Sequence, residues 1–138
     1  MTAVPTRRFP IELGKRSRPV LRLFGVRAEN AYVELGDHLE AHFGVGHLRT
    51  PIANITGWRI EGPWLWITAI GIRRSLRHGD VTFGGTHRGG VRIDFRERVR
   101  TVGFDVPALY VTVADPEGFA AALSALGVPG VDARRSSR

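Results

Sequence analysis

Residues 89–127, GGVRIDFRERVRTVGFDVPALYVTVADPEGFAAALSALG, carry the clearest structural pattern in the chain. Apolar side chains alternate with polar ones over 91–96, and the alternation returns over 109–113. A period of two residues is typical of strands that bury one face and expose the other. The two segments therefore predict adjacent strands near the end of the chain.

A sharply bounded helix follows these strands. Asp115, Pro116 and Glu117 provide an N-cap, a proline for the first helical position and an early acid. Gly127 stands where a helix commonly ends in a left-handed residue. The apolar stripe between these two signals consists of Phe119, Leu123 and Leu126. We predict an amphipathic helix over 115–127 that covers the strands.

On the N-terminal side of this region, short extended segments recur at close spacing. Turn residues separate most of them, and Gly36-Asp37 predicts a hairpin. Residues 64–74 fit a strand or a short helix equally, because a short apolar run does not fix the period. The predicted strands are 20–26, 31–35, 39–43, 47–52, 56–62 and 81–83. About seven short strands and one helix favour a small barrel or sandwich.

The order of predicted strands followed by one C-terminal helix resembles that of the pleckstrin-homology-like barrel of short bacterial proteins. The likeness lies mainly in ALYVTVADPEGFAAALSAL (108–126) and in PIANITG (51–57). The segments 70–73 and 81–84 are similar to those of small actinobacterial proteins of about this length. The resemblance implies a mainly β fold, a seven-stranded antiparallel open barrel with a C-terminal capping helix. The loop 27–30 holds one arginine and one acid, which does not favour inositol-phosphate recognition.

Charge is concentrated at the ends of the chain. Of the net charge of +7, residues 1–18 contribute +4 and 128–138 contribute +2, so 19–127 is nearly neutral. We therefore predict one domain over 19–127 between two basic tails that are dispensable for folding. Phe9, Ile11 and Leu13 leave open one added edge strand. The tails are either solvated chain ends or segments that weakly attract nucleic acid or acidic membrane.

Cellular location is predicted from what the sequence lacks. There is no cysteine, so disulfides and thiolate chemistry are absent. The basic N-terminus lacks the apolar run of a secretory signal, and the apolar run 63–72 is too short to span a membrane. We expect a cytoplasmic protein that is not an integral membrane protein.

The best anion-binding candidate is the arginine–glycine region 73–90. Glycine-rich backbone can turn N–H groups toward an anion, and arginines can chelate phosphate oxygens. The candidate residues are Arg73, Arg77, Arg88, Gly84 and Gly85. No Walker or Rossmann motif is present, and a hairpin with solvated arginines explains the same residues.

Two further groups have alternative interpretations. His38, Glu40 and His42 share one face of a predicted strand, where an exposed polar face is the simpler interpretation and a metal site the alternative. We predict no metal and no cofactor. Trp64 and Trp66 also share a face, either in the core or at a partner surface.

No catalytic constellation appears in the sequence, so the leading function is a non-enzymatic module that binds a partner protein or peptide, with homodimer formation left open. The first alternative is a small-ligand β-barrel protein or enzyme that handles a flavin or nucleotide, with its phosphate held by 73–90. The second is association of the tails with nucleic acid or acidic membrane. The sequence does not name the ligand or the partner.

Overall fold

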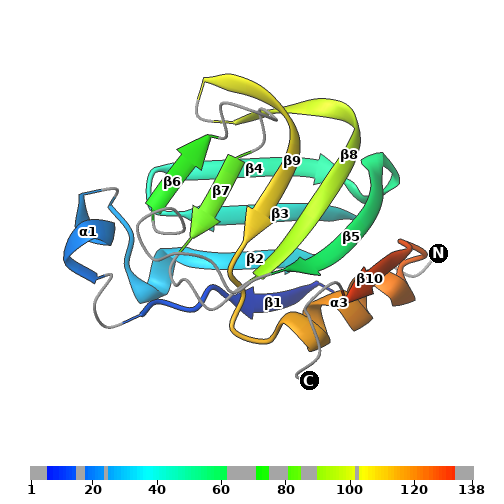
Figure 1. Cartoon of the computed structure of the whole chain (residues 1–138), viewed down its shortest axis with the longest axis horizontal. Helices are drawn as coiled ribbons and strands as arrows, with labels where there is room; N and C mark the ends of the chain where they lie inside the picture. Colours follow the sequence, from blue (N-terminus) through cyan, green and yellow to red (C-terminus); the bar gives the residue numbers. More distant parts are fainter. Residues whose placement is uncertain are drawn as a thin grey trace.

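A computed structural model describes residues 6–14, 18–23, 25–61, 71–74, 81–84, 90–101 and 103–132. The chain is mainly β, with two sheets and a helix near the C-terminus (Figure 1). The elements are β1 (Arg7–Pro10), α1 (Arg18–Arg22), η2 (Ala28–Asn30), β2 (Ala31–Leu35), β3 (His38–Phe43), β4 (Gly46–Pro51), η3 (Ile52–Asn54), β5 (Ile55–Glu61), β6 (Gly71–Arg74), β7 (Val81–Gly84), β8 (Gly90–Thr101), β9 (Phe104–Val111), α3 (Pro116–Ala125) and β10 (Gly130–Asp132).

The first sheet is an antiparallel meander in the order β1–β2–β3–β4. The second sheet has the order β10–β5–β8–β9–β7–β6. Its centre, β5–β8–β9, is antiparallel, whereas β7 joins β9 and β10 joins β5 in parallel. In Figure 1 the strands β8 and β9 cross over those of the first sheet.

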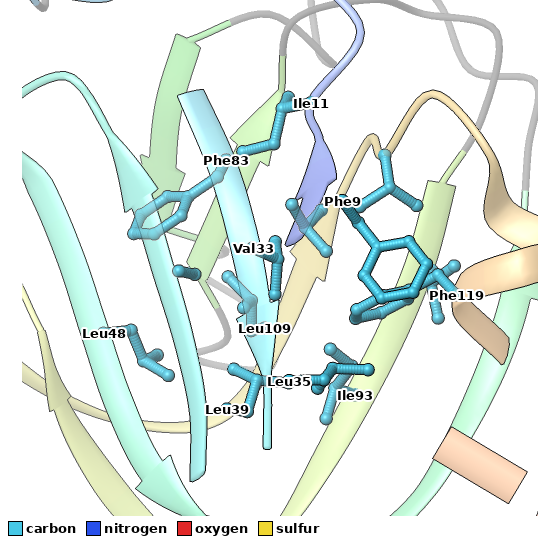
Figure 2. Close-up of a cluster of buried hydrophobic side chains, with 14 of the residues drawn as sticks. Phe9, Ile11, Val33, Leu35, Leu39, Leu48, Phe83, Ile93, Leu109 and Phe119 are labelled. Atoms are coloured by element: carbon cyan, nitrogen blue, oxygen red, sulfur yellow. The ribbon is translucent and has the colours of Figure 1, made fainter. Parts of the chain in front are cut away.

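The core lies between the two sheets, where both contribute alternate side chains (Figure 2). On β3 the odd positions 39, 41 and 43 are buried and the even positions are not. Phe43 of the first sheet stacks on Phe83 of the second, with ring centroids 5.8 Å apart. Because each sheet keeps one apolar face, the pattern of period two in the sequence translates directly into this core.

The helix α3 begins and ends as the sequence predicts. The Asp115 carboxylate accepts a hydrogen bond from the Gly118 amide at 3.0 Å, and Gly127 has a φ of 91°. Phe119 is fully buried, and its ring meets that of Phe9 edge-on at 5.2 Å. The helix therefore covers an apolar edge of the core next to β1.

Both predicted tails contribute to the fold, so the folded domain extends beyond 19–127. Phe9 and Ile11 are buried, and β1 forms the edge strand that the sequence left open. Glu12 donates its amide to Thr112 at 2.8 Å and so joins this segment to the chain after β9. At the other end, β10 lies within the predicted C-terminal tail and pairs with β5. These end strands are difficult to predict from sequence, because a strand of three or four residues contains few apolar residues to mark it.

Three other expectations require correction. Residues 18–22 form α1 rather than the start of a strand over 20–26, because Pro19 favours a helix start and a short apolar run does not fix the period. The described strands number ten rather than seven, and not all pairings are antiparallel. The two sheets are not closed into a barrel, since β1–β4 and β5–β10 have separate ladders.

No helix in the described part of the chain is both long and apolar enough to cross a membrane.

Candidate functional site

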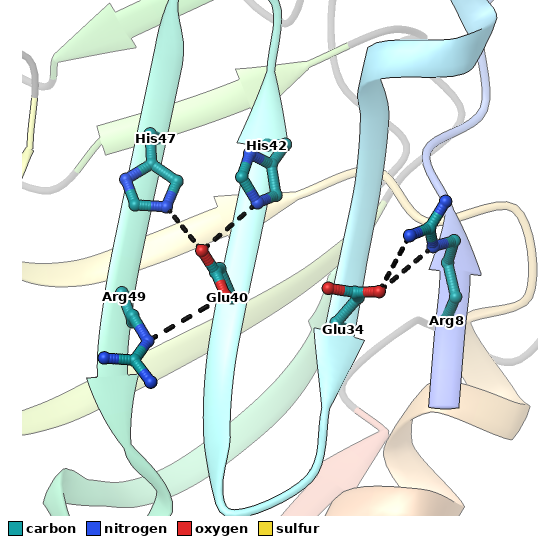
Figure 3. A network of polar contacts seen from close by, with 6 residues as sticks. All are labelled: Arg8, Glu34, Glu40, His42, His47 and Arg49. Carbon is teal, nitrogen blue, oxygen red and sulfur yellow. Dashed lines mark hydrogen bonds and ion pairs between the residues drawn. The ribbon is translucent and has the colours of Figure 1, made fainter. Parts of the chain in front are cut away.

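The outer face of the first sheet carries a cluster of polar side chains (Figure 3). The face exists because β2, β3 and β4 turn their alternate residues away from the core. His38, Glu40 and His42 lie on this face of β3, as their alternation predicts. His47 and Arg49 of β4 complete it beside them.

Glu40 is the centre of the cluster. Its Oε2 lies 2.8 Å from Nε2 of His47 and 3.3 Å from Nε2 of His42. Its other oxygen, Oε1, lies 3.8 Å from Nε of Arg49. Figure 3 shows the carboxylate between these three side chains. One carboxylate therefore links two imidazoles and a guanidinium across two strands.

The strand register produces this arrangement. His42 stands opposite His47, and Glu40 stands opposite Arg49. Directly opposed residues have Cβ atoms about 5 Å apart, whereas residues two apart on one strand are about 7 Å apart. His38 lies opposite Pro51 and is not part of the cluster of potential metal ligands. The spacing H-x-E-x-H therefore predicts correctly that His38, Glu40 and His42 share one face. It does not indicate that His47, rather than His38, joins His42 beside Glu40.

His47 was missed because sequence reasoning considered only spacing along one strand. The signal that identifies it is the turn between the strands. Gly44 has a φ of 60°, a conformation that favours glycine, and the tight turn Gly44-Val45 places residue 47 opposite residue 42.

The charges of Glu40 and Arg8 are each paired with neighbouring side chains. The hydrogen bond from His47 is the main cause that lowers the pKa of the Glu40 carboxyl, with help from His42 and Arg49 and against the effect of desolvation. The hydrogen bond to Glu34, at 2.9 Å, raises the pKa of the Arg8 guanidinium. Both shifts favour the ionised forms, so these groups are charged at neutral pH.

A line of stacked side chains crosses the same face. The Arg8 guanidinium lies 3.9 Å from the centroid of the Tyr32 ring. Tyr32 is 4.8 Å from the His42 ring, which is 4.6 Å from the His47 ring. Cation–π contacts at exposed sites and aromatic pairs each contribute about 0.5–1.5 kcal/mol, so these contacts favour the observed arrangement. The face is ordered by its own contacts.

A pocket of about 210 Å³ lies beside the cluster. It contains three carboxylates, those of Glu34, Asp37 and Glu40, and one guanidinium, that of Arg49. The pocket is lined by Thr6, Glu34, Gly36, Asp37, His38, Glu40 and Arg49. It is therefore an acidic hollow on a chain whose net charge is +7.

The residues predicted to bind an anion are only partly within the described chain. Arg73 lies on β6 opposite Thr82, and Gly84 ends β7 opposite Gly71. The two strands form an antiparallel pair, so the structure brings the Arg73 and Gly84 segments together. Arg77, Gly85 and Arg88 lie outside the described residues, and so do Trp64 and Trp66.

The remaining tryptophan, Trp58, is described and has a structural position. It is half-buried on β5 and packs against the core. Its indole Nε1 donates a hydrogen bond to the Val128 carbonyl at 3.2 Å. Gly130 lies against its ring, where a Cβ would collide with it. Trp58 therefore secures the chain after α3 to the second sheet.

Comparison with known proteins finds no matching family model, curated protein or solved structure.

Proposed function

We propose that the protein is a non-enzymatic binding module that holds a basic side chain of a partner peptide or protein in the pocket beside Glu40. The observation that carries this proposal is the gathering of three carboxylates around one hollow. Two guanidiniums stand against them, that of Arg49 in the lining and that of Arg8 paired with Glu34, which leaves a formal charge of about −1 at neutral pH. Such a surface attracts a cation and repels an anion.

Asp37 is the group most available to a ligand. Glu34 is paired with Arg8, and Glu40 is paired with the imidazoles and Arg49. The exposed Asp37 carboxylate has no hydrogen bond or ion pair within the part of the chain that the structure describes. A lysine ammonium or an arginine guanidinium would give it a charge-assisted hydrogen bond.

The size of the pocket favours one side chain over a cofactor. Sites for drug-sized ligands and cofactors occupy about 300–1,000 Å³. The present hollow, at about 210 Å³, is smaller and lies on an open sheet face. The neighbouring Arg8 and Tyr32 are of the types enriched where proteins meet, and they offer a rigid rim for the flanking residues of a peptide.

The arrangement of strands supports a pleckstrin-homology-like relationship, which we include in the proposal. Four strands in a meander, then the antiparallel strands β5, β8 and β9, then α3, give the expected order of seven strands and a helix. In this interpretation α1 is an insertion between β1 and β2, β6 and β7 are an insertion between β5 and β8, and β10 is a C-terminal addition.

The test is a selection of random peptides displayed on the surface of phage, with the whole chain as bait. We expect the selected peptides to share a lysine or arginine. Synthetic copies of these peptides should bind the wild-type protein in fluorescence anisotropy. Asp37→Asn should lower their affinity by about tenfold, because it removes one charged hydrogen bond worth about 1.5 kcal/mol.

The matched control is Asp105→Asn, which removes an exposed carboxylate at the start of β9. It should leave the affinity of the selected peptides unchanged. Peptides without a basic residue, or equal loss of affinity in both variants, would show that the pocket is not the binding site.

A further inference from the structure

We infer that Glu40, His42 and His47 form a binding site for a divalent transition-metal ion. This goes beyond the proposed capture of a basic side chain and does not depend on it. Two imidazoles and one carboxylate are a donor set that zinc sites use, with remaining positions left to water or substrate. The three side chains come from two adjacent strands and lie on one exposed face.

The distances between donor atoms suit one ion. One ligand atom from each residue lies within 4.8 Å of the other two. Bonds of about 2.0–2.1 Å in a tetrahedral zinc site place ligand atoms about 3.4 Å apart. The two contacts of Glu40 Oε2, at 2.8 Å and 3.3 Å, are already close to this spacing. An ion would replace hydrogen bonds that now hold the three groups together.

The backbone under these ligands is fixed from the opposite side. Ala41 and Phe43, which alternate with the ligands on β3, are fully buried, and so is Leu48 next to His47. The His47 carbonyl accepts a hydrogen bond of 2.6 Å from the hydroxyl of Thr101, at the end of β8. Ligands on such anchored strands need little reordering when they bind an ion.

Two neighbouring side chains, Tyr32 and Arg49, contact the proposed ligands. The Tyr32 ring lies 4.8 Å from the His42 ring at a tilt of 33°. The contact of Arg49 is with Oε1 of Glu40, so Oε2 is the oxygen that faces both imidazoles. Outer contacts of this kind commonly orient metal ligands.

The donor chemistry limits the choice of ion. Imidazole suits Zn²⁺, Cu²⁺, Ni²⁺ and Co²⁺, whereas Mg²⁺ and Ca²⁺ prefer sites made of oxygen ligands. The side chains of His42, Glu40 and His47 are 30%, 31% and 49% exposed, so an ion can enter directly from solvent. We expect Zn²⁺ and Co²⁺ to bind and Mg²⁺ not to compete.

The experiment is calorimetric titration of the whole metal-free chain with Zn²⁺, followed by ¹H–¹⁵N spectra of the histidine rings. We expect a site with a stoichiometry of one, and ring shifts assigned to His42 and His47. His42→Gln and His47→Gln should each weaken the binding of Zn²⁺ by at least about tenfold. Even substitutions of residues that only contact the metal ligands lower metal affinity by about 10–100-fold. Addition of Co²⁺ should produce the visible absorption bands of a protein-bound Co²⁺ ion in a low-symmetry site.

His38→Gln is the matched control, because His38 shares the strand and face of His42 without belonging to the cluster. It should leave Zn²⁺ affinity and the two ring shifts unchanged. Thermal melting of each variant separates loss of a ligand from loss of the fold. The inference is overturned if Zn²⁺ fails to bind, or if folded His42→Gln and His47→Gln variants bind it as wild type does. Equal loss in His38→Gln would assign the ion to another site, and failure of the peptide selection would leave this result unaffected.

Discussion

Replacing Phe119 with alanine tests whether α3 is an integral part of the core. The Phe119 side chain is fully buried, and its edge-on contact with Phe9 has a centroid distance of 5.2 Å. Truncation of a buried phenylalanine costs about 3–5 kcal/mol, and an aromatic pair contributes about 0.5–1.5 kcal/mol of such a loss. We expect Phe119→Ala to lower the free energy of unfolding by about 4 kcal/mol and Tm by roughly 10–15 °C.

Urea unfolding followed by tryptophan fluorescence is a suitable assay, because Trp58 donates a hydrogen bond to Val128, just beyond α3. A double-mutant cycle with Phe9→Ala should give a coupling energy of about 1 kcal/mol. Phe104→Ala is the matched control: that side chain is 47% exposed and its loss should cost less than about 1 kcal/mol. A cost below about 1 kcal/mol at Phe119 would refute the assignment of α3 to the core.

Four other changes test the N-cap of α3, the two ends of the chain and one close contact. Asp115→Ala removes the N-cap of α3 and should cost about 1 kcal/mol in thermal unfolding, whereas Asp115→Asn should cost less. Deletion of 1–13 removes buried side chains of β1 and should abolish cooperative unfolding, while deletion of 133–138 should change Tm by no more than a few degrees. Gly90→Ala would place a Cβ 2.9 Å from Thr112 Cα and against the Val111 carbonyl, so a loss of about 1–3 kcal/mol is expected in urea unfolding.

The parts of the fold that the sequence predicts are those with one buried face. On β3 and β4 burial alternates at every residue, so the apolar period marks both strands and the direction of their polar side chains. The helix is equally clear, because Asp115 and Gly127 mark its two ends chemically.

The parts that could not be predicted depend on contacts distant in sequence. The parallel pairing of β7 with β9 brings Phe83 opposite Val111, and no local pattern specifies it. For β1 the alternation of Phe9 and Ile11 allows a strand, but its pairing with β2 and the contact of Phe9 with Phe119 of α3 depend on distant segments. The cluster of Glu40, His42 and His47 depends on cross-strand register, so its members do not form a motif along the chain.

The two proposed ligands of the polar face should oppose each other. Glu40 lines the pocket and is also a proposed metal ligand, so a bound Zn²⁺ would place two positive charges beside the hollow. Charges at a surface separated by about 6 Å interact by roughly 1–3 kcal/mol at an effective dielectric between those of water and protein surface. Saturating Zn²⁺ should therefore weaken the binding of a basic peptide by about 5–150-fold, and by linkage the peptide should weaken the binding of Zn²⁺ by the same factor. Anisotropy titrations with and without Zn²⁺ measure the effect, and His47→Gln should remove it. Unchanged peptide affinity in a protein shown to hold Zn²⁺ would place the two ligands on separate surfaces.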